Sequence, residues 1–137
     1  MMIRILIVDD NPTFVAAVRQ FLDFLPGAEV VGNARTAEEA LGTGRMLEPD
    51  LVLIDVEIPG MHGLDIAARM HAWPRPPCTM LLSIHDTSDY VAAATAIGVL
   101  GLASKSDFVT ALLPAIEELV AARLPAAECT VAKQPAA

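Results

Sequence analysis

The sequence predicts one α/β domain built on a parallel sheet that is covered by helices on both faces. Short apolar runs bounded by polar or turn residues indicate fully buried strands, as at residues 3–8, 51–54 and 80–82. Between these runs, apolar residues recur every three to four positions, which is typical of amphipathic helices. Strict alternation of the two patterns favours a doubly wound α/β sandwich.

Local signals mark the ends of several of these elements. Asn11 is a helix cap, and Pro12 follows it at an early helical position. Thr36 and Glu39 have the spacing of a capping box. Pro114 should kink or break the last helix, because proline lacks a backbone donor and clashes with the preceding turn. In chain order we expect strands at 3–8, 28–32, 51–54, 78–83 and 98–103, and helices at about 12–25, 37–47, 63–72, 88–97 and 106–123.

Five strand–helix units with short loops limit the topology. Right-handed crossovers and the small size favour the flavodoxin-like strand order 2-1-3-4-5 in a five-stranded parallel sheet. We expect this domain to cover residues 1–123. Residues 124–137 are rich in proline and alanine without periodicity, so we expect them to form a flexible tail.

The composition is that of an ordinary globular domain. Of 137 residues, 54% are hydrophobic and 19% are charged, which argues against disorder. The net charge of −8 argues against a nucleic-acid surface, because phosphate contacts need clustered lysine and arginine. No apolar stretch reaches the roughly 18–20 residues that span a bilayer, and the first residues do not form a secretion signal. We therefore expect this chain alone to bind neither membrane nor nucleic acid. Its two cysteines lack metal-ligand spacing, which indicates reduced thiols and a cytoplasmic protein.

Acidic and hydroxyl side chains come at the ends of three predicted strands. Asp9 and Asp10 follow the first strand, Asp55 ends the third, and Ser83 ends the fourth. Ligands of parallel α/β sheets bind in the crevice beyond the carboxyl ends of the strands. Carboxylates this close require a cation or a proton, so the pattern predicts a divalent-metal site. The alternative is helix capping, which Asp10 or Asn11 could perform alone.

These strand-end residues, together with Lys105 after the fifth strand, resemble the receiver domain of bacterial response regulators. The resemblance covers nearly the whole chain, through about residue 123. It includes Pro59 and Gly63 in the loop that follows Asp55. It is specific because four motifs occur in the family's order and spacing. The complete set favours a functional site over helix capping.

The resemblance implies that Asp55 is a phosphoacceptor that works with Mg²⁺. A carboxylate becomes a useful nucleophile toward phosphorus when a metal ion neutralises the incoming phosphoryl oxygens. Asp10 and Asp55 would supply side-chain ligands, with Asp9 acting directly or through water. The backbone carbonyl of Glu57 would complete the protein's share of the coordination.

Other residues near the implied phosphate have roles by the same resemblance. Lys105 would pair with the acceptor and then with its phosphoryl group, and Ser83 would donate its hydroxyl to a phosphoryl oxygen. His85 lies two residues beyond Ser83 and either tunes phosphate hydrolysis or is a surface residue. The chain departs from the family at Leu102, where many receivers carry tyrosine or phenylalanine, and at Ile84, where a small residue is common. Leu102 cannot act as an aromatic switch.

The resemblance implies a signalling switch rather than an enzyme. A histidine kinase or phosphotransfer protein would supply the phosphoryl group. A downstream protein would bind the face formed by residues 88–97, residues 98–103 and the last helix, and homodimerisation is left open. A second interpretation is the receiver half of a longer DNA-binding regulator. A third is a Mg²⁺-dependent phosphohydrolase of similar fold, in which Glu57 would replace the usual aspartate acid.

Overall fold

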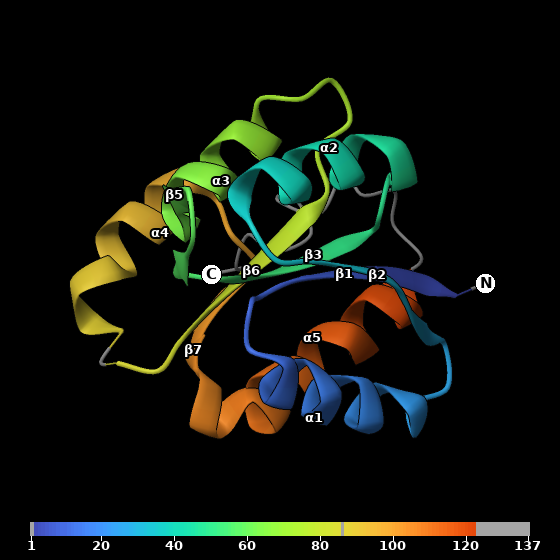
Figure 1. The fold of residues 1–137 in the computed structure, drawn as a ribbon. Coiled ribbons are helices and arrows are strands. Elements are labelled where there is room, and N and C mark those ends of the chain that lie inside the picture. The colour runs from blue at the N-terminus through green and yellow to red at the C-terminus, as the bar shows by residue number, and fades with distance from the viewer. Residues whose placement is uncertain (1, 86, 123–137) are drawn as a thin grey trace.

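The computed structural model describes residues 2–85 and 87–122, in which a five-stranded parallel sheet lies between two layers of helices (Figure 1). The strands of this sheet are β1 (Ile3–Val8), β2 (Ala28–Ala34), β3 (Leu51–Asp55), β6 (Cys78–Ser83) and β7 (Gly101–Ser104). Their order across the sheet is β2-β1-β3-β6-β7. Because β6 and β7 are the fourth and fifth strands of this sheet along the chain, the predicted fold class and the order 2-1-3-4-5 are confirmed.

Helices cover both faces of the sheet. In the described residues the α-helices are α1 (Pro12–Asp23), α2 (Ala37–Leu47), α3 (Gly63–His71), α4 (Val91–Ile97) and α5 (Phe108–Ala122). The 3₁₀ turns η1 (Ser88–Tyr90) and η2 (Lys105–Asp107) precede α4 and α5. α1 and α5 pack on one face, and α2, α3 and α4 cover the other (Figure 1). None of the helices in this described part is long and apolar enough to cross a membrane.

The strand β1 shows why the strand sequences are continuously apolar. Ile5 and Ile7 belong to the core cluster under α1 and α5, whereas Leu6 and Val8 belong to the cluster under α2, α3 and α4. Successive side chains of a strand point to opposite faces, so a sheet covered on both sides needs apolar residues at every position. Burying each of these side chains contributes about 1.5–3 kcal/mol relative to leaving it exposed.

The register of the strands brings their carboxyl ends to one edge. Val8 pairs with Ile54 across β1 and β3, and Asp55 pairs with Leu82 across β3 and β6. The last residue of β6 likewise pairs with the last residue of β7. The residues that follow these strands therefore start from the same level of the sheet, which is where the sequence predicts the site.

Some element boundaries differ from the prediction. β2 continues to Ala34, and a hairpin of two short strands, β4 (Glu57–Ile58) and β5 (Met61–His62), follows β3. Strands of two residues are too short for any periodicity to reveal them. β7 begins at Gly101 rather than at residue 98, because Gly98, with φ 92°, still belongs to the end of α4.

Of the kink or break expected at Pro114, the break is absent, because α5 continues through this residue, and the kink stays a prediction. Pro114 and Thr110, whose carbonyl loses its helical donor, are both exposed. Water can therefore bind that carbonyl in place of the missing N–H. The predicted tail, residues 124–137, lies outside the described residues.

Two glycines offer a matched test of packing near the site. A Cβ on Gly63 would lie 2.5 Å from the carbonyl oxygen of Asp55, whereas a Cβ on Gly42 meets nothing within 4 Å. We expect Gly63→Ala to lower the free energy of unfolding by about 1–3 kcal/mol, because rigid backbone must move. Gly42→Ala should raise it by about 0.5–1 kcal/mol, since alanine favours a helix interior. Urea denaturation measures both, and a Gly63→Ala protein as stable as the parent would refute the packing argument.

Candidate functional site

Three carboxylates meet at the carboxyl edge of the sheet. Asp9 and Asp55 are buried, with 2% and 7% of their surfaces exposed, and Asp10 is exposed. One carboxylate oxygen from each of the three lies within 4.8 Å of the others. Backbone N–H groups hold the two buried carboxylates. That of Asn11 donates to Asp9 Oδ1 at 2.9 Å, and that of Glu57 donates to Asp55 Oδ1 at 3.1 Å.

Lys105 is the cation at the centre of this site. It begins η2 directly after β7, and its side chain is only 9% exposed. Its Nζ lies 2.6 Å from Asp9 Oδ2 and 3.2 Å from Asp55 Oδ2. Nζ also lies 4.6 Å from the ring centroid of Phe14, whose face attracts a cation. The predicted meeting of Lys105 with the strand-end acids is therefore present, and Phe14 is a contact that the sequence reasoning missed.

Burial and charge together shift the pKa values of this group. Burial raises the pKa of Asp55 above its ordinary value, and repulsion by Asp9 acts in the same direction. The N–H of Glu57 and the ammonium of Lys105 oppose that shift without reversing it. For Lys105, burial lowers the pKa, but the hydrogen bonds and attraction of Asp9 and Asp55 outweigh burial and raise it. Proximity to Asp9 thus makes ionisation harder for Asp55 and protonation easier for Lys105.

The donor set fits a hard divalent cation. Carboxylate oxygens are the ligands that Mg²⁺ prefers, and the ion usually keeps several waters. Asp9, Asp10 and Asp55 with Lys105 leave two negative charges uncompensated, which one divalent ion neutralises. The exposed Asp10 gives such an ion access from solvent. Coordination of the ion by the backbone carbonyl of Glu57 stays a prediction.

Ser83 lies at the same edge and is fully buried. Its Oγ accepts a hydrogen bond from the backbone N–H of His85 at 3.0 Å. Within the described residues, Ser83 makes no hydrogen bond to the carboxylates. Its hydroxyl proton is therefore available to a ligand oxygen that arrives beside Asp55.

The structure also joins two rim residues that sequence reasoning treated separately. His85 Nε2 lies 3.3 Å from Glu57 Oε1, with the two side chains 62% and 50% exposed. Glu57 comes two residues after Asp55, at the end of β3, and His85 comes two residues after Ser83, at the end of the neighbouring strand β6. That matching position was a signal in the sequence that could have predicted the pair.

The two positions that depart from the family pattern have different environments. Leu102, in β7, is partly buried and packs against the core cluster under α2, α3 and α4. It occupies a packed position without any polar group to reach the site. Ile84 is 64% exposed, beside the buried Ser83.

The family comparison matches this geometry. The sequence model of the response regulator receiver domain family matches residues 5–117 of the chain. The nitrate/nitrite response regulator protein NarL of Escherichia coli (strain K12) is 28% identical over 120 residues, which are 88% of this chain and 56% of the relative. Protein-glutamate methylesterase/protein-glutamine glutaminase of Agrobacterium fabrum is 36% identical over 103 residues, which are 74% of this chain and 29% of that relative. The chain thus spans less than two thirds of the length of these curated relatives.

Solved structures agree on the fold. The crystal structure of a two-component response regulator of the LuxR family from Aurantimonas sp. SI85-9A1 has a TM-score of 0.79 and 30% sequence identity, and the match covers 89% of this chain and 87% of that one. A CheY-like response regulator receiver domain protein from Methanospirillum hungatei JF-1 has a TM-score of 0.72 at 23% identity, covering 86% of this chain and 96% of that one.

The raised pKa of Asp55 predicts a pH dependence of stability. The folded protein binds the Asp55 proton more tightly than the unfolded chain, so stability falls as pH rises from the ordinary value of 3.8 through the raised pKa. At neutral pH without metal, Asp55→Asn should therefore raise the melting temperature by on the order of a few degrees. Near pH 4 the difference should shrink.

Thermal unfolding across pH measures this effect, and Asp65→Asn is the matched control because Asp65 is exposed on α3. Lys105 keeps Asp9 as a partner at 2.6 Å in the Asp55 variant. A metal-free Asp55→Asn protein that is less stable than the parent at pH 7 would show that the buried charge is not destabilising.

Proposed function

This chain belongs to the response regulator receiver domain family, and on that premise we propose that it is a phosphorylation-dependent signalling switch with Asp55 as phosphoacceptor. The observation that carries this proposal is the cluster of Asp9, Asp10 and Asp55 at the edge of the sheet, in which Lys105 pairs with Asp9 and Asp55. Three acids gathered from two strand ends and one buried cation are costly to assemble for packing alone. Their arrangement supports phosphoryl transfer to a carboxylate.

In the proposed reaction, Asp55 attacks the phosphorus of a phosphohistidine on a histidine kinase or phosphotransfer protein. The new P–O bond forms as the P–N bond breaks, and the histidine imidazole leaves. A bound Mg²⁺ would neutralise phosphoryl oxygens, held by Asp10 and Asp55 with Asp9 directly or through water. Glu57 N–H keeps the Asp55 carboxylate oriented, and Lys105 is near enough to pair with the incoming phosphoryl group.

The response would follow from the charge that phosphorylation adds. The phosphoryl group adds about −1.5 to −2 charge and strong acceptor oxygens. Ser83 can donate its hydroxyl to one of these oxygens while its Oγ holds the N–H of His85. A shift of Ser83 would then move the loop that leads to η1 and α4. The outcome is a change in populations, set by how differently the phosphate contacts the two states.

The proposed readout surface is the face of α4, β7 and α5. Val91 on α4 and Val109 on α5 are 52% and 43% exposed, so each of these helices has one apolar side chain that a partner can cover. The relatives favour one elaboration of this role. Transcriptional regulatory protein MctR of Rhizobium johnstonii is 28% identical to this chain, which spans 54% of it, so this elaboration is the receiver part of a longer transcriptional regulator that binds DNA through another domain.

Phosphorylation of Asp55 can be tested by intact-mass measurement after incubation with Mg²⁺ and acetyl phosphate. The parent protein should gain the mass of one phosphoryl group, and Asp55→Asn should gain none. Asp65→Asn, an exposed change of the same kind, should behave like the parent. Removal of Mg²⁺ with a chelator should abolish the gain. Equal labelling of Asp55→Asn and the parent would exclude Asp55 as the acceptor.

Variants at Ser83 and Leu102 distinguish a signal carried by the Ser83 hydroxyl from one carried by β7. Ser83→Ala removes the hydroxyl that links the phosphate to the loop, whereas Leu102→Ala only trims a packed side chain. We expect Ser83→Ala to lose more than half of the phosphorylation-induced NMR shifts of the amides of His85 and residues 87–90. Leu102→Ala should keep most of them. The reverse order would show that β7, and not the hydroxyl, carries the signal.

A further inference from the structure

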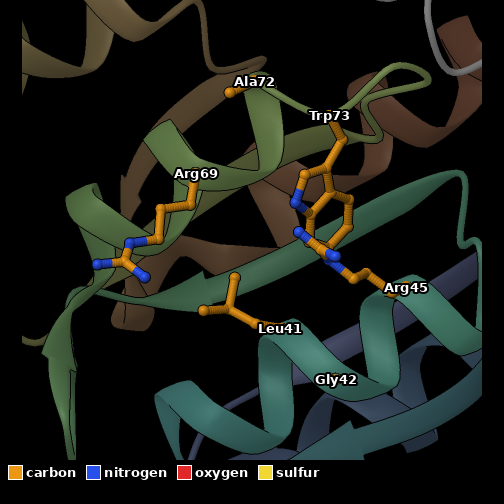
Figure 2. A pocket seen from close by; sticks show the side chains of 6 residues that line it. All are labelled: Leu41, Gly42, Arg45, Arg69, Ala72 and Trp73. Carbon is orange, nitrogen blue, oxygen red and sulfur yellow. The ribbon is translucent and has the colours of Figure 1, made fainter.

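A groove between α2 and α3 is separate from the acidic site. It encloses about 430 Å³ and is lined by Leu41, Gly42, Arg45, Arg69, Ala72 and Trp73 (Figure 2). Both arginines lie in the last turns of their helices. In a parallel α/β fold the last turns of the helices lie toward the amino ends of the strands, away from the carboxyl edge. The groove therefore lies toward the opposite end of these helices from Asp55.

The described lining of the groove contains two arginines and no acidic residue. Neither Arg45 nor Arg69 forms an ion pair within residues 2–85 and 87–122. Positive charge at a helix C-terminus is favourable by about 0.3–1 kcal/mol, which accounts for arginine at each position. It does not account for both guanidinium groups bordering one groove with an indole. In a chain of net charge −8, the residues that line this groove carry positive charge only.

The apolar part of the groove is held in place before any ligand arrives. The guanidinium of Arg45 lies 5.3 Å from the ring centroid of Trp73. The edge of the same indole packs so closely on α2 that a Cβ on Gly44 would lie 3.1 Å from it. Leu41 and Trp73 both pack on the core cluster beneath.

The order of groups along the groove indicates what fits it. Figure 2 shows Arg69 at one end, Arg45 with Trp73 at the other, and Leu41 between them. A ligand with an anionic group at each end can engage both guanidinium groups. A peptide with acidic residues on either side of an apolar one matches this order, because arginine binds carboxylates in a bidentate manner. Tryptophan and arginine are also the residue types that dominate binding at protein interfaces.

We propose that the groove of α2 and α3 binds an acidic peptide segment of a partner protein, with carboxylates at Arg45 and Arg69 and an apolar side chain against Leu41 and Trp73. The contact does not use the acidic site, so it should form whether or not Asp55 is phosphorylated. Its dependence on two exposed charges makes it sensitive to salt.

Trp73 is the one tryptophan of the 137-residue chain, so its fluorescence reports on the groove. The full chain is titrated with acetyl-Glu-Glu-Leu-Glu-Glu-amide, and with the lysine counterpart as the charge-reversed control. We expect a saturable fluorescence change with the acidic peptide alone, weakened at about 0.5 M NaCl. No saturable change, or an equal response to the lysine peptide, would overturn the proposal.

Calorimetric titration of charge-reversed variants with the acidic peptide shows which arginines bind it. Arg45→Glu and Arg69→Glu should each raise the dissociation constant by about tenfold or more, since each loses a charged partner and gains a repulsive one. Arg19→Glu, an exposed arginine on α1 across the sheet, should leave it unchanged. Circular dichroism checks folding, and acetyl phosphate labelling of all variants checks the acidic site independently. Unchanged affinity in the protein that carries both Arg45→Glu and Arg69→Glu, or displacement of the peptide by equimolar pyrophosphate, would rule out a peptide groove.

Discussion

The ammonium group of Lys105 between Asp9 and Asp55 is the interaction on which the rest of the site depends. Its Nζ lies 2.6 Å from one buried carboxylate and 3.2 Å from the other. Taking these charges out of water is costly, and removing Lys105 would leave both buried carboxylates without their cation. The arrangement persists because β3 and β7 deliver their ends to one edge of the sheet. Burial and the charge of Asp9 also raise the pKa of Asp55, so the ionised carboxylate is disfavoured. A bound metal ion or a phosphoryl group on Asp55 would offset this cost.

Much of the fold was predictable because the strands are buried on both faces. Each strand is then a continuous apolar run, and the first polar residue after it marks the carboxyl edge of the sheet. The site residues Asp9, Asp55 and Ser83 were found by that rule. The hairpin of β4 and β5 was not, because two-residue strands have no periodicity. The continuation of α5 through Pro114 was missed because exposure to water, a tertiary property, decides whether a lost backbone bond matters.

Side-chain pairs between loops were the least predictable part of the site. His85 and Glu57 meet at 3.3 Å only because β3 and β6 are neighbours in the sheet. The bond from the His85 N–H to Ser83 Oγ gives the loop after β6 a direct connection to the proposed phosphate. Such a connection suits a chain in which Leu102 replaces the aromatic residue of many receivers. The groove of α2 and α3 adds a positive surface toward the other end of these helices, so two proposed binding functions occupy separate places on one small domain.

The most direct test of the central claim is a crystal structure of the protein with Mg²⁺ and beryllofluoride. We expect a metal ion bound by Asp10 and Asp55, beryllofluoride on the carboxylate of Asp55, and Lys105 paired with a fluorine. A site without metal, with the Asp55 side chain turned away from Asp9 and Asp10, would contradict it.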